Sequence, residues 1–207
     1  MRSGVIVAGG RSTRFGETDK AVADLAGTPM IRRVADRMNH VGELGDLVVN
    51  SREEQVEAIR EALDGIGLDV QFAPDPDPDE GPTAGIRTGL RSVETDYAAV
   101  VACDMPFVEP ALLNYLFERA EGHDAAVARL DDGWFQPTQA VYRASAMADA
   151  CDAALSRGER RIIAAFDDLD VVMVPEDEVR RHAPIGTFRN LNTQEEFEQA
   201  SEELGVD

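Results

Sequence analysis

A glycine turn followed by a lone lysine is the part of this sequence best suited to bind an anion. Residues 5–25 read VIVAGGRSTRFGETDKAVADL, an apolar run that turns through Gly9 and Gly10 and then carries arginines and Lys20. Glycines let a backbone approach phosphate oxygens closely, and the exposed N–H groups of such loops bind anions. Lys20 is the only lysine in a chain that has 40 acidic residues. The sequence therefore predicts a phosphate site at this turn.

Three kinds of nucleotide-binding loop begin with glycines, and the residues around Lys20 distinguish them. A P-loop needs Gly-Lys-Ser/Thr, whereas Lys20 follows Asp19 and precedes Ala21. A dinucleotide-binding turn needs G-x-G-x-x-G at the start of a long helix, and AGGRSTRFG does not match it. The remaining kind wraps a nucleoside triphosphate, and Arg14 and Lys20 would supply positive charge to its phosphates. We therefore expect a triphosphate loop.

Polar residues also lie at the ends of three later apolar runs, at Asn50, Asp75 and Asp104. Ligands of an open parallel sheet bind beyond the carboxyl ends of its strands, so we expect these side chains and the glycine turn to form one site. A carboxylate at Asp104 would suit Mg²⁺, which binds through one or two carboxylates together with substrate phosphates. The alternative interpretation is that polar residues end strands because loops are hydrated, with Asp104 as a turn residue or helix cap.

The alternation of apolar runs with amphipathic segments predicts the elements that position these residues. Such alternation is typical of a parallel sheet covered by helices on both faces. We therefore expect a single α/β domain over residues 1–207, with three layers and a mostly parallel sheet. The predicted strands of the first half are 5–8, 46–50, 69–73 and 97–103, and the predicted helices are 29–39, 52–63, 83–92 and 110–120.

The second half of the chain has a less regular pattern. Thr193 and Glu196 form a Thr-x-x-Glu capping box, which predicts the start of a last helix. Prolines alternate with aspartates over residues 74–82, and such a segment is expected to be a loop because it holds neither a helix nor a central strand. The other expected elements are a strand at 125–130, an aromatic segment at 134–142, helices at 144–155 and 162–166, and a strand at 170–175.

The composition excludes several classes of protein. No apolar run approaches the roughly 18 residues that a membrane span needs, and the N-terminus lacks the segments of a signal peptide. We therefore expect a cytoplasmic protein with no membrane partner. A nucleic-acid partner is also not expected, because phosphate backbones require a basic surface and the net charge is −20. The acidic surplus and the single lysine resemble proteins from a salt-rich cytoplasm, so we hypothesise a halophilic source.

The cysteines and histidines show no spacing typical of a metal or redox site. Cys103 and Cys151 are expected to be free thiols in a reducing compartment. His40, His123 and His182 are scattered along the chain, and we expect surface or packing roles for them. The candidate chemistry therefore rests on carboxylates, amides and cations.

Six motifs together resemble one family of enzymes. The first loop is similar to the signature loop of nucleotidyltransferases with a GT-A-like, Rossmann-like fold, and the next two motifs match that family too. The later three resemble the molybdenum cofactor guanylyltransferases, or MobA-like NTP transferases, in particular. The resemblance covers nearly the whole chain. The motifs are AGGRSTRFGETDK (8–20), GPTAGI (81–86), CDMPF (103–107), QPT (136–138), GERR (158–161) and FRNLNT (188–193).

The resemblance implies transfer of GMP from GTP to the phosphate of molybdopterin, which forms the guanine dinucleotide cofactor and pyrophosphate. It implies catalytic roles for Lys20, Arg14 and Asp104, with Asp104 as the ligand of Mg²⁺. Residues 1–107 would bind the nucleotide and residues 108–207 the acceptor. The implied nucleotide-binding residues are Val7, Ala8, Gly9, Gly10, Lys20, Asn50, Asp75, Gly81 and Asp104, and the implied acceptor-binding residues are Pro137, Arg160, Arg161, Asn190 and Asn192.

Other functions are compatible with the same nucleotide loop. One is a cytidylyltransferase acting on molybdopterin, and another is a guanylyltransferase acting on cobinamide phosphate or a sugar phosphate. A further alternative is a nucleotide-binding regulator without catalysis, against which the intact Lys20 and Asp104 count. Arg160 and Arg161 would, without an acceptor, be an exposed pair between two helices. The enzymes that receive the cofactor are expected as transient partners.

Overall fold

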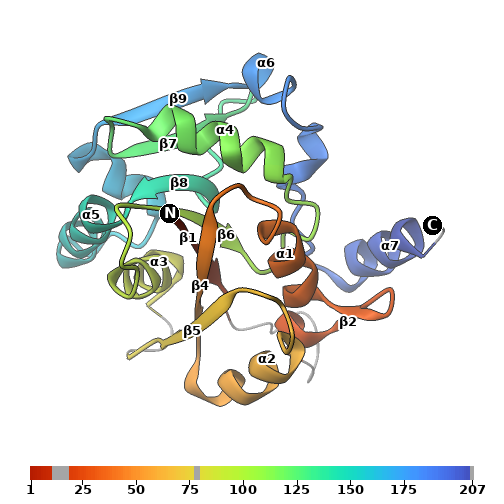
Figure 1. The fold of residues 1–207 in the computed structure, drawn as a ribbon. Helices are drawn as coiled ribbons and strands as arrows, with labels where there is room; N and C mark the ends of the chain where they lie inside the picture. The colour runs from red at the N-terminus through yellow and green to blue at the C-terminus, as the bar shows by residue number, and fades with distance from the viewer. Residues whose placement is uncertain (11–18, 77–79, 206–207) are drawn as a thin grey trace.

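The structure, a computed structural model, describes residues 1–10, 19–76 and 80–205. Its centre is a sheet with the strand order β5-β4-β1-β6-β8-β7-β9, which runs through the middle of Figure 1. Strand β8 is antiparallel to its neighbours β6 and β7, and the other pairs in this sheet are parallel. The strands are β1 (Arg2–Val7), β4 (Leu44–Ser51), β5 (Asp69–Pro74), β6 (Tyr97–Ala102), β7 (Ala125–Arg129), β8 (Gln139–Arg143) and β9 (Val171–Pro175).

Helices cover both faces of the sheet and give the three-layer α/β arrangement that the sequence predicts. Helices α1, α2 and α4 pack on one face and α3 and α5 on the other (Figure 1). Helix α7 packs instead on a small ribbon of β2 (Asp24–Leu25) and β3 (Thr28–Pro29). The helices are α1 (Met30–Met38), α2 (Val56–Ala62), α3 (Pro82–Arg91), α4 (Pro110–Ala120), α5 (Ala144–Ser156), α6 (Glu176–Val179) and α7 (Gln194–Leu204). Short 3₁₀ turns are η1 (Lys20–Val22), η2 (Glu53–Gln55), η3 (Ile162–Asp168) and η4 (Ile185–Phe188).

Strand β6 explains why the sequence contains an unbroken apolar run. Ala98 and Val100 belong to the core on the α3 side of the sheet, whereas Ala99 and Val101 belong to the core on the α4 side. All four side chains are fully buried. Because successive residues of a strand point to opposite faces, a strand covered on both sides must be apolar throughout.

Most predicted elements lie where the sequence placed them. The predicted helix at 110–120 coincides with α4, and the capping box at Thr193 is present, with Glu196 N donating to Thr193 Oγ1 at 3.2 Å. The helix predicted at 52–63 is shorter, because it opens as the 3₁₀ turn η2 and becomes α-helical at Val56. The ribbon β2–β3, helix α6 and turn η4 were not predicted. Elements of two to four residues are too short to leave a periodic pattern in a sequence.

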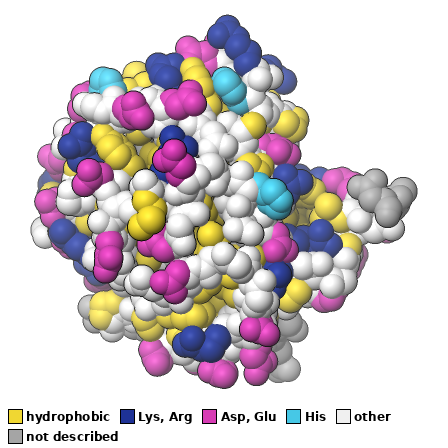
Figure 2. Space-filling model, in the orientation of Figure 1, with side chains coloured by type: hydrophobic (Ala, Val, Ile, Leu, Met, Phe, Trp, Pro, Cys, Tyr) yellow, Lys and Arg dark blue, Asp and Glu magenta, His cyan; other side chains and the backbone are white. Residues whose placement is uncertain are grey.

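The surface carries many acidic side chains, which Figure 2 shows scattered over one face of the molecule. Several of them pair with arginines, such as Asp36 with Arg32 and Asp177 with Arg181, each at 2.8 Å. Within the described ranges, the helices are too short or too polar to cross a lipid bilayer.

Helix α3 packs closely on the sheet because two glycines face the strands. A Cβ atom at Gly85 would lie 2.5 Å from Asn50 Oδ1, and one at Gly89 would lie 2.5 Å from Val5 Cγ1. Non-bonded carbon atoms are at their optimum near 3.5–4.0 Å, so a side chain at either position would push the helix away. The glycines therefore keep α3 close to strands β1 and β4.

We expect Gly89→Ala to lower the free energy of unfolding by about 1–3 kcal/mol, the usual cost of forcing an extra carbon into a packed core. Gly186→Ala is the matched control, since no heavy atom lies within 4 Å of a Cβ at that position. Denaturant unfolding of both variants in molar KCl would measure the difference. Equal stability of the two variants would contradict the close contact between α3 and β1.

Candidate active site

The carboxyl ends of β4, β1 and β6 meet at one edge of the sheet, as the sequence predicts. The amide of Ala8 donates to the carbonyl of Asn50 at 2.8 Å, and the amide of Cys103 donates to the carbonyl of Val7 at 3.1 Å. These bonds place the start of the glycine turn between Asn50 and the CDMPF motif. Gly10, the second glycine of the turn, is exposed. Arg14 lies outside the described residues.

The reversal of β8 brings the QPT motif to the same edge. Because β8 is antiparallel to β6, its first residues lie beside the last residues of β6. The amide of Ala102 donates to the carbonyl of Thr138 at 2.9 Å, and the hydroxyl of Tyr142 donates to the carbonyl of Pro137 at 2.7 Å. A motif from the second half of the chain therefore lies next to the motif that carries Asp104.

Lys20, Asp104 and Asn192 form the centre of the site. The ammonium Nζ of Lys20 lies 2.9 Å from Asp104 Oδ2 and 3.3 Å from Asn192 Oδ1. The side chain of Lys20 is 11% exposed and that of Asp104 21% exposed, so the ion pair lies mostly out of solvent. The amide of Leu191 donates to the carbonyl of Asp104 at 3.0 Å and fixes Asn192 nearby. Residues predicted from separate motifs therefore meet at one ammonium group.

The side chains around Asp104 fit a metal ion that enters the site together with the substrate. Among the described residues, no group of three or more His, Cys, Asp or Glu side chains is arranged to hold a metal ion. Mg²⁺ is usually bound by one or two carboxylates, with substrate phosphates and water as its other ligands. A single partly exposed carboxylate such as Asp104 fits that pattern, and the neighbouring Lys20 would face the same phosphates.

The surroundings of the thiol beside Asp104 favour its neutral form. Burial, together with the negative charge of Asp104, raises the pKa of Cys103 far above the ordinary value of a thiol. Reactive cysteines need the thiolate form, which a positive or polar environment favours. Cys103 therefore stays neutral, and a covalent cysteine mechanism does not fit this site.

Asn50 and Asp75 form a second polar pair at the same edge. Asn50 is fully buried, and its Nδ2 donates to the carbonyl of Ala73 at 3.1 Å and to Asp75 Oδ1 at 2.7 Å. A Cβ atom at Gly9 would lie 2.5 Å from Asp75 Oδ2, so the turn passes this carboxylate only because it has a glycine there. Asn50 thus positions Asp75, and Asp75 is the member of the pair that a ligand can reach.

The predicted acceptor residues lie around the start of α3 and after η4. Thr83 Oγ1 donates to the carbonyl of Arg160 at 2.7 Å, which brings the exposed Arg160 and Arg161 beside the N-terminal end of α3. Gly81 caps that helix with φ of 92°, a left-handed conformation that favours glycine. Asn190 lies after η4 and is partly exposed.

Turn η4 is held by a buried threonine that the sequence did not reveal. Thr187 is fully buried, and its Oγ1 accepts from Gln139 Nε2 at 2.8 Å and from the amide of Glu109 at 3.0 Å. The network ties the segment that carries Asn190 and Asn192 to strand β8. Thr187 adjoins the FRNLNT motif, which is the only signal that could have pointed to it.

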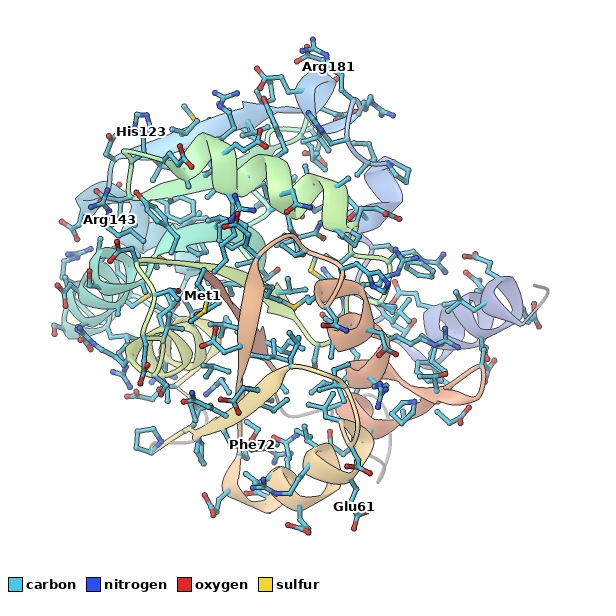
Figure 3. The ribbon with its side chains drawn as sticks, in the orientation of Figure 1. Met1, Glu61, Phe72, His123, Arg143 and Arg181 are labelled. Atoms are coloured by element: carbon cyan, nitrogen blue, oxygen red, sulfur yellow. The ribbon has the colours of Figure 1, made fainter. Side chains whose placement is uncertain are left out.

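The histidines lie away from this edge or on the surface. Figure 3 labels His123 and Arg143, which lie near each other at the opposite edge of the sheet, where β7 begins and β8 ends. Arg143 Nη2 donates to the carbonyl of His123 at 3.4 Å. The ring of His182 stacks on Tyr115 with centroids 3.9 Å apart, and His40 is exposed.

Known proteins resemble this chain over nearly its whole length. A family model described as "MobA-like NTP transferase domain" matches residues 4–188. The chain is 51% identical over 203 residues to a "Probable molybdenum cofactor guanylyltransferase" of Natronomonas pharaonis, with 98% of both chains covered. It is 36% identical to the protein of the same name from Haloferax mediterranei, with 93% of this chain and 89% of that one covered. Both are halophilic archaea, in agreement with the source inferred from the composition.

Solved structures agree with the fold. "Molybdopterin-guanine dinucleotide biosynthesis protein A" from Archaeoglobus fulgidus superposes with a TM-score of 0.80 at 28% identity, with 99% of this chain and 100% of that one covered. A 4-diphosphocytidyl-2C-methyl-D-erythritol synthase from Anaerococcus prevotii superposes with a TM-score of 0.75 at 14% identity, a likeness that concerns the fold alone. The nucleotidyltransferase fold predicted from the sequence is confirmed.

We expect Asp75→Asn to stabilise the protein most at high pH. Burial raises the pKa of Asp75, although hydrogen bonds from Asn50 and Thr88 lower it. The folded state therefore binds this proton more tightly than the unfolded chain, so ionised Asp75 destabilises the fold as the pH rises. Asp75→Asn removes that charge and keeps the Oδ1 acceptor. Thermal unfolding should show a higher Tm than wild type at pH 8, and the gain should shrink as the pH falls toward the ordinary carboxyl pKa of 3.8.

The exposed Asp69, at the start of the strand β5 that Asp75 follows, provides the control Asp69→Asn. Its effect on Tm should not follow the same trend with pH. A gain from Asp75→Asn that stays constant from pH 8 down to the ordinary carboxyl pKa of 3.8 would contradict the burial of an ionised carboxylate in the site.

Proposed function

The chain belongs to the MobA-like NTP transferase family, and we propose that it transfers GMP from GTP to the terminal phosphate of molybdopterin, with Lys20 and Asp104 at the reacting phosphates. The observation that carries this proposal is the ion pair of Lys20 and Asp104 at the carboxyl edge of the sheet. It is supported by 51% identity to a relative named for that activity, with 98% of the relative covered.

The proposed reaction is a displacement at the α-phosphorus of GTP. A terminal phosphate oxygen of molybdopterin attacks this phosphorus in line, a new P–O–P bond forms, and the bond to the β-phosphate oxygen breaks to release pyrophosphate. The attacking phosphate is already ionised, so no general base is needed. Catalysis of phosphoryl transfer consists mainly of positioning and charge stabilisation. Lys20 would stabilise the departing pyrophosphate, together with Arg14 from the glycine-rich loop.

Asp104 would hold Mg²⁺ that enters with GTP. The ion would neutralise charge on the phosphates between which the bond breaks. The ammonium of Lys20 lies 2.9 Å from the same carboxylate. With Asp104 holding the ion, Lys20 would bind phosphate oxygens. The two residues therefore act on the same phosphates from neighbouring positions.

The first and second parts of the chain would bind different substrates. We assign GTP to residues 1–107 through the backbone at Val7 to Gly10, with Asp75 and Gly81, and molybdopterin to residues 108–207. Arg160 and Arg161 would neutralise phosphate on the acceptor, and Pro137, Asn190 and Asn192 would line its path. The contact of Asn192 with Lys20 is where the two substrates would meet.

We infer the cellular compartment of the reaction from the free thiols and from the product. Cys103 and Cys151 are both free, and free thiols persist in the reducing cytoplasm. We propose that the enzyme works there and hands its product to the enzymes that use the cofactor through transient contacts.

A direct product assay tests the proposed function. The protein would be incubated in molar KCl with Mg²⁺, molybdenum cofactor and either GTP or CTP, and products would be identified by mass spectrometry. We expect the guanine dinucleotide with GTP and no dinucleotide with CTP. Product from CTP alone would overturn the choice of nucleotide. Absence of product with both, in a protein that still binds GTP, would overturn the choice of acceptor.

We expect Asp104→Asn to fold and bind GTP but to lower Mg²⁺-dependent turnover by about 10²–10³-fold, the usual cost of losing one electrostatic contact to a transition state. Asp177→Asn on helix α6 is the control, because Asp177 is exposed and forms an ion pair with Arg181, four residues along the chain. Steady-state rates at several Mg²⁺ concentrations would compare the two. Undiminished turnover of Asp104→Asn would remove this carboxylate from the mechanism.

A further inference from the structure

A buried glutamine next to the site contacts both ends of the glycine-rich turn. Gln55 is the last residue of η2 and is 3% exposed. Its Nε2 donates to Asp19 Oδ2 at 2.7 Å and lies 3.4 Å from the carbonyl oxygen of Ala8, which it also contacts as a donor. Ala8 and Asp19 flank residues 9–18 in the chain, so one amide nitrogen joins the two positions on either side of this segment.

The orientation of the Gln55 amide is set by its own turn. The backbone amide of Arg52 donates to Gln55 Oε1 at 2.8 Å, and Arg52 Nε donates to the same oxygen at 3.3 Å. With its oxygen engaged by two donors, the amide must direct its nitrogen toward Asp19. A glutamine at this position is thus a donor on one side and an acceptor on the other, which neither glutamate nor a hydrophobic residue can be.

Asp19 transmits this contact to the lysine. Its second oxygen, Oδ1, accepts from the amide of Ala21 at 3.0 Å and caps the 3₁₀ turn that begins with Lys20. The same carboxylate is therefore fixed by Gln55 on one side and fixes the backbone of Lys20 on the other. Lys20 then extends from this turn to Asp104 at 2.9 Å.

We propose that Gln55 is a positioning residue for Lys20. By holding Asp19 and the end of β1 together, it sets the place from which the ammonium reaches the phosphates of GTP. The inference rests on the proposed function for its kinetic readout. Loss of the amide donor would leave Asp19 Oδ2 without this hydrogen bond in a partly buried position, which moves the turn that carries Lys20.

The test exchanges the amide of Gln55 and the carboxylate of Asp19. Gln55→Glu places two carboxylates against each other, and we expect it to lower kcat/KM for GTP about tenfold or more. Combining Gln55→Glu with Asp19→Asn restores a hydrogen bond of reversed direction, while Oδ1 at position 19 still caps Ala21. The double variant should therefore recover most of the lost kcat/KM. The KM for molybdopterin should stay within about twofold in all of these proteins.

Two further variants distinguish a positioning role of Gln55 from a general effect on stability. Gln55→Met keeps the side-chain length without the amide, and we expect a loss of kcat/KM for GTP even where the fold is intact by circular dichroism. Gln199→Glu, an amide-to-acid change on the exposed face of α7, should leave the kinetics unchanged. A double variant no better than Gln55→Glu, or a Gln55→Met with wild-type kcat/KM, would overturn the inference.

Calorimetric titration with GTP alone makes the outcome independent of the acceptor. If the wild-type protein makes no dinucleotide, the proposed function fails. The inference about Gln55 is then decided by binding, because Gln55→Glu should weaken GTP binding and the double variant should restore it. Equal GTP affinity in wild type, Gln55→Glu and the double variant would overturn the inference even if the product assay succeeds.

Discussion

The ion pair between Lys20 and Asp104 is the constraint on which the arrangement of the site depends. A chain with a net charge of −20 repels a nucleoside triphosphate and a phosphorylated acceptor, so their binding needs a local cation. An unpaired charge that is 11% exposed would be costly, and Asp104 and Asn192 supply its partners. The need to surround one ammonium therefore brings together the ends of β1 and β6 and the segment after η4.

The pairing also prepares the site for its substrates. Before they bind, Lys20 and Asp104 lie 2.9 Å apart and neutralise each other. Under the proposed mechanism Asp104 would hold Mg²⁺ and Lys20 would bind phosphate oxygens, so each side chain would still have a partner of opposite charge. A site built this way needs little reorganisation, which is the general source of electrostatic catalysis in phosphoryl transfer. A paired ammonium of this kind gives a strongly acidic molybdenum cofactor guanylyltransferase a local cation for its anionic substrates.

The sequence was sufficient to predict the long, apolar elements of the fold, such as β6. It also showed the motifs that carry Lys20 and Asp104. It also placed Asn50 and Asp75 together, because residues at the ends of adjacent parallel strands share an edge. It could not show that Asn50 is buried and serves Asp75, since depth at a strand end depends on α3 packing through Gly85. Gln55 and Thr187 were missed for a similar reason. Their roles come from partners 36 and 48 residues away, and no local pattern records such distances.

Two carboxylates of the site are held by neutral amides instead of cations. Asn50 donates to Asp75 at 2.7 Å, and Gln55 donates to Asp19 at 2.7 Å. An arginine or lysine in either place would satisfy the carboxylate more strongly, but it would add a second fixed cation that could bind phosphate in the wrong position. An amide orients the carboxylate without supplying a competing charge. Within the described part of the site, Lys20 is the cation that lies 2.9 Å from Asp104, and under the proposed mechanism the position of this ammonium would determine where the triphosphate is held.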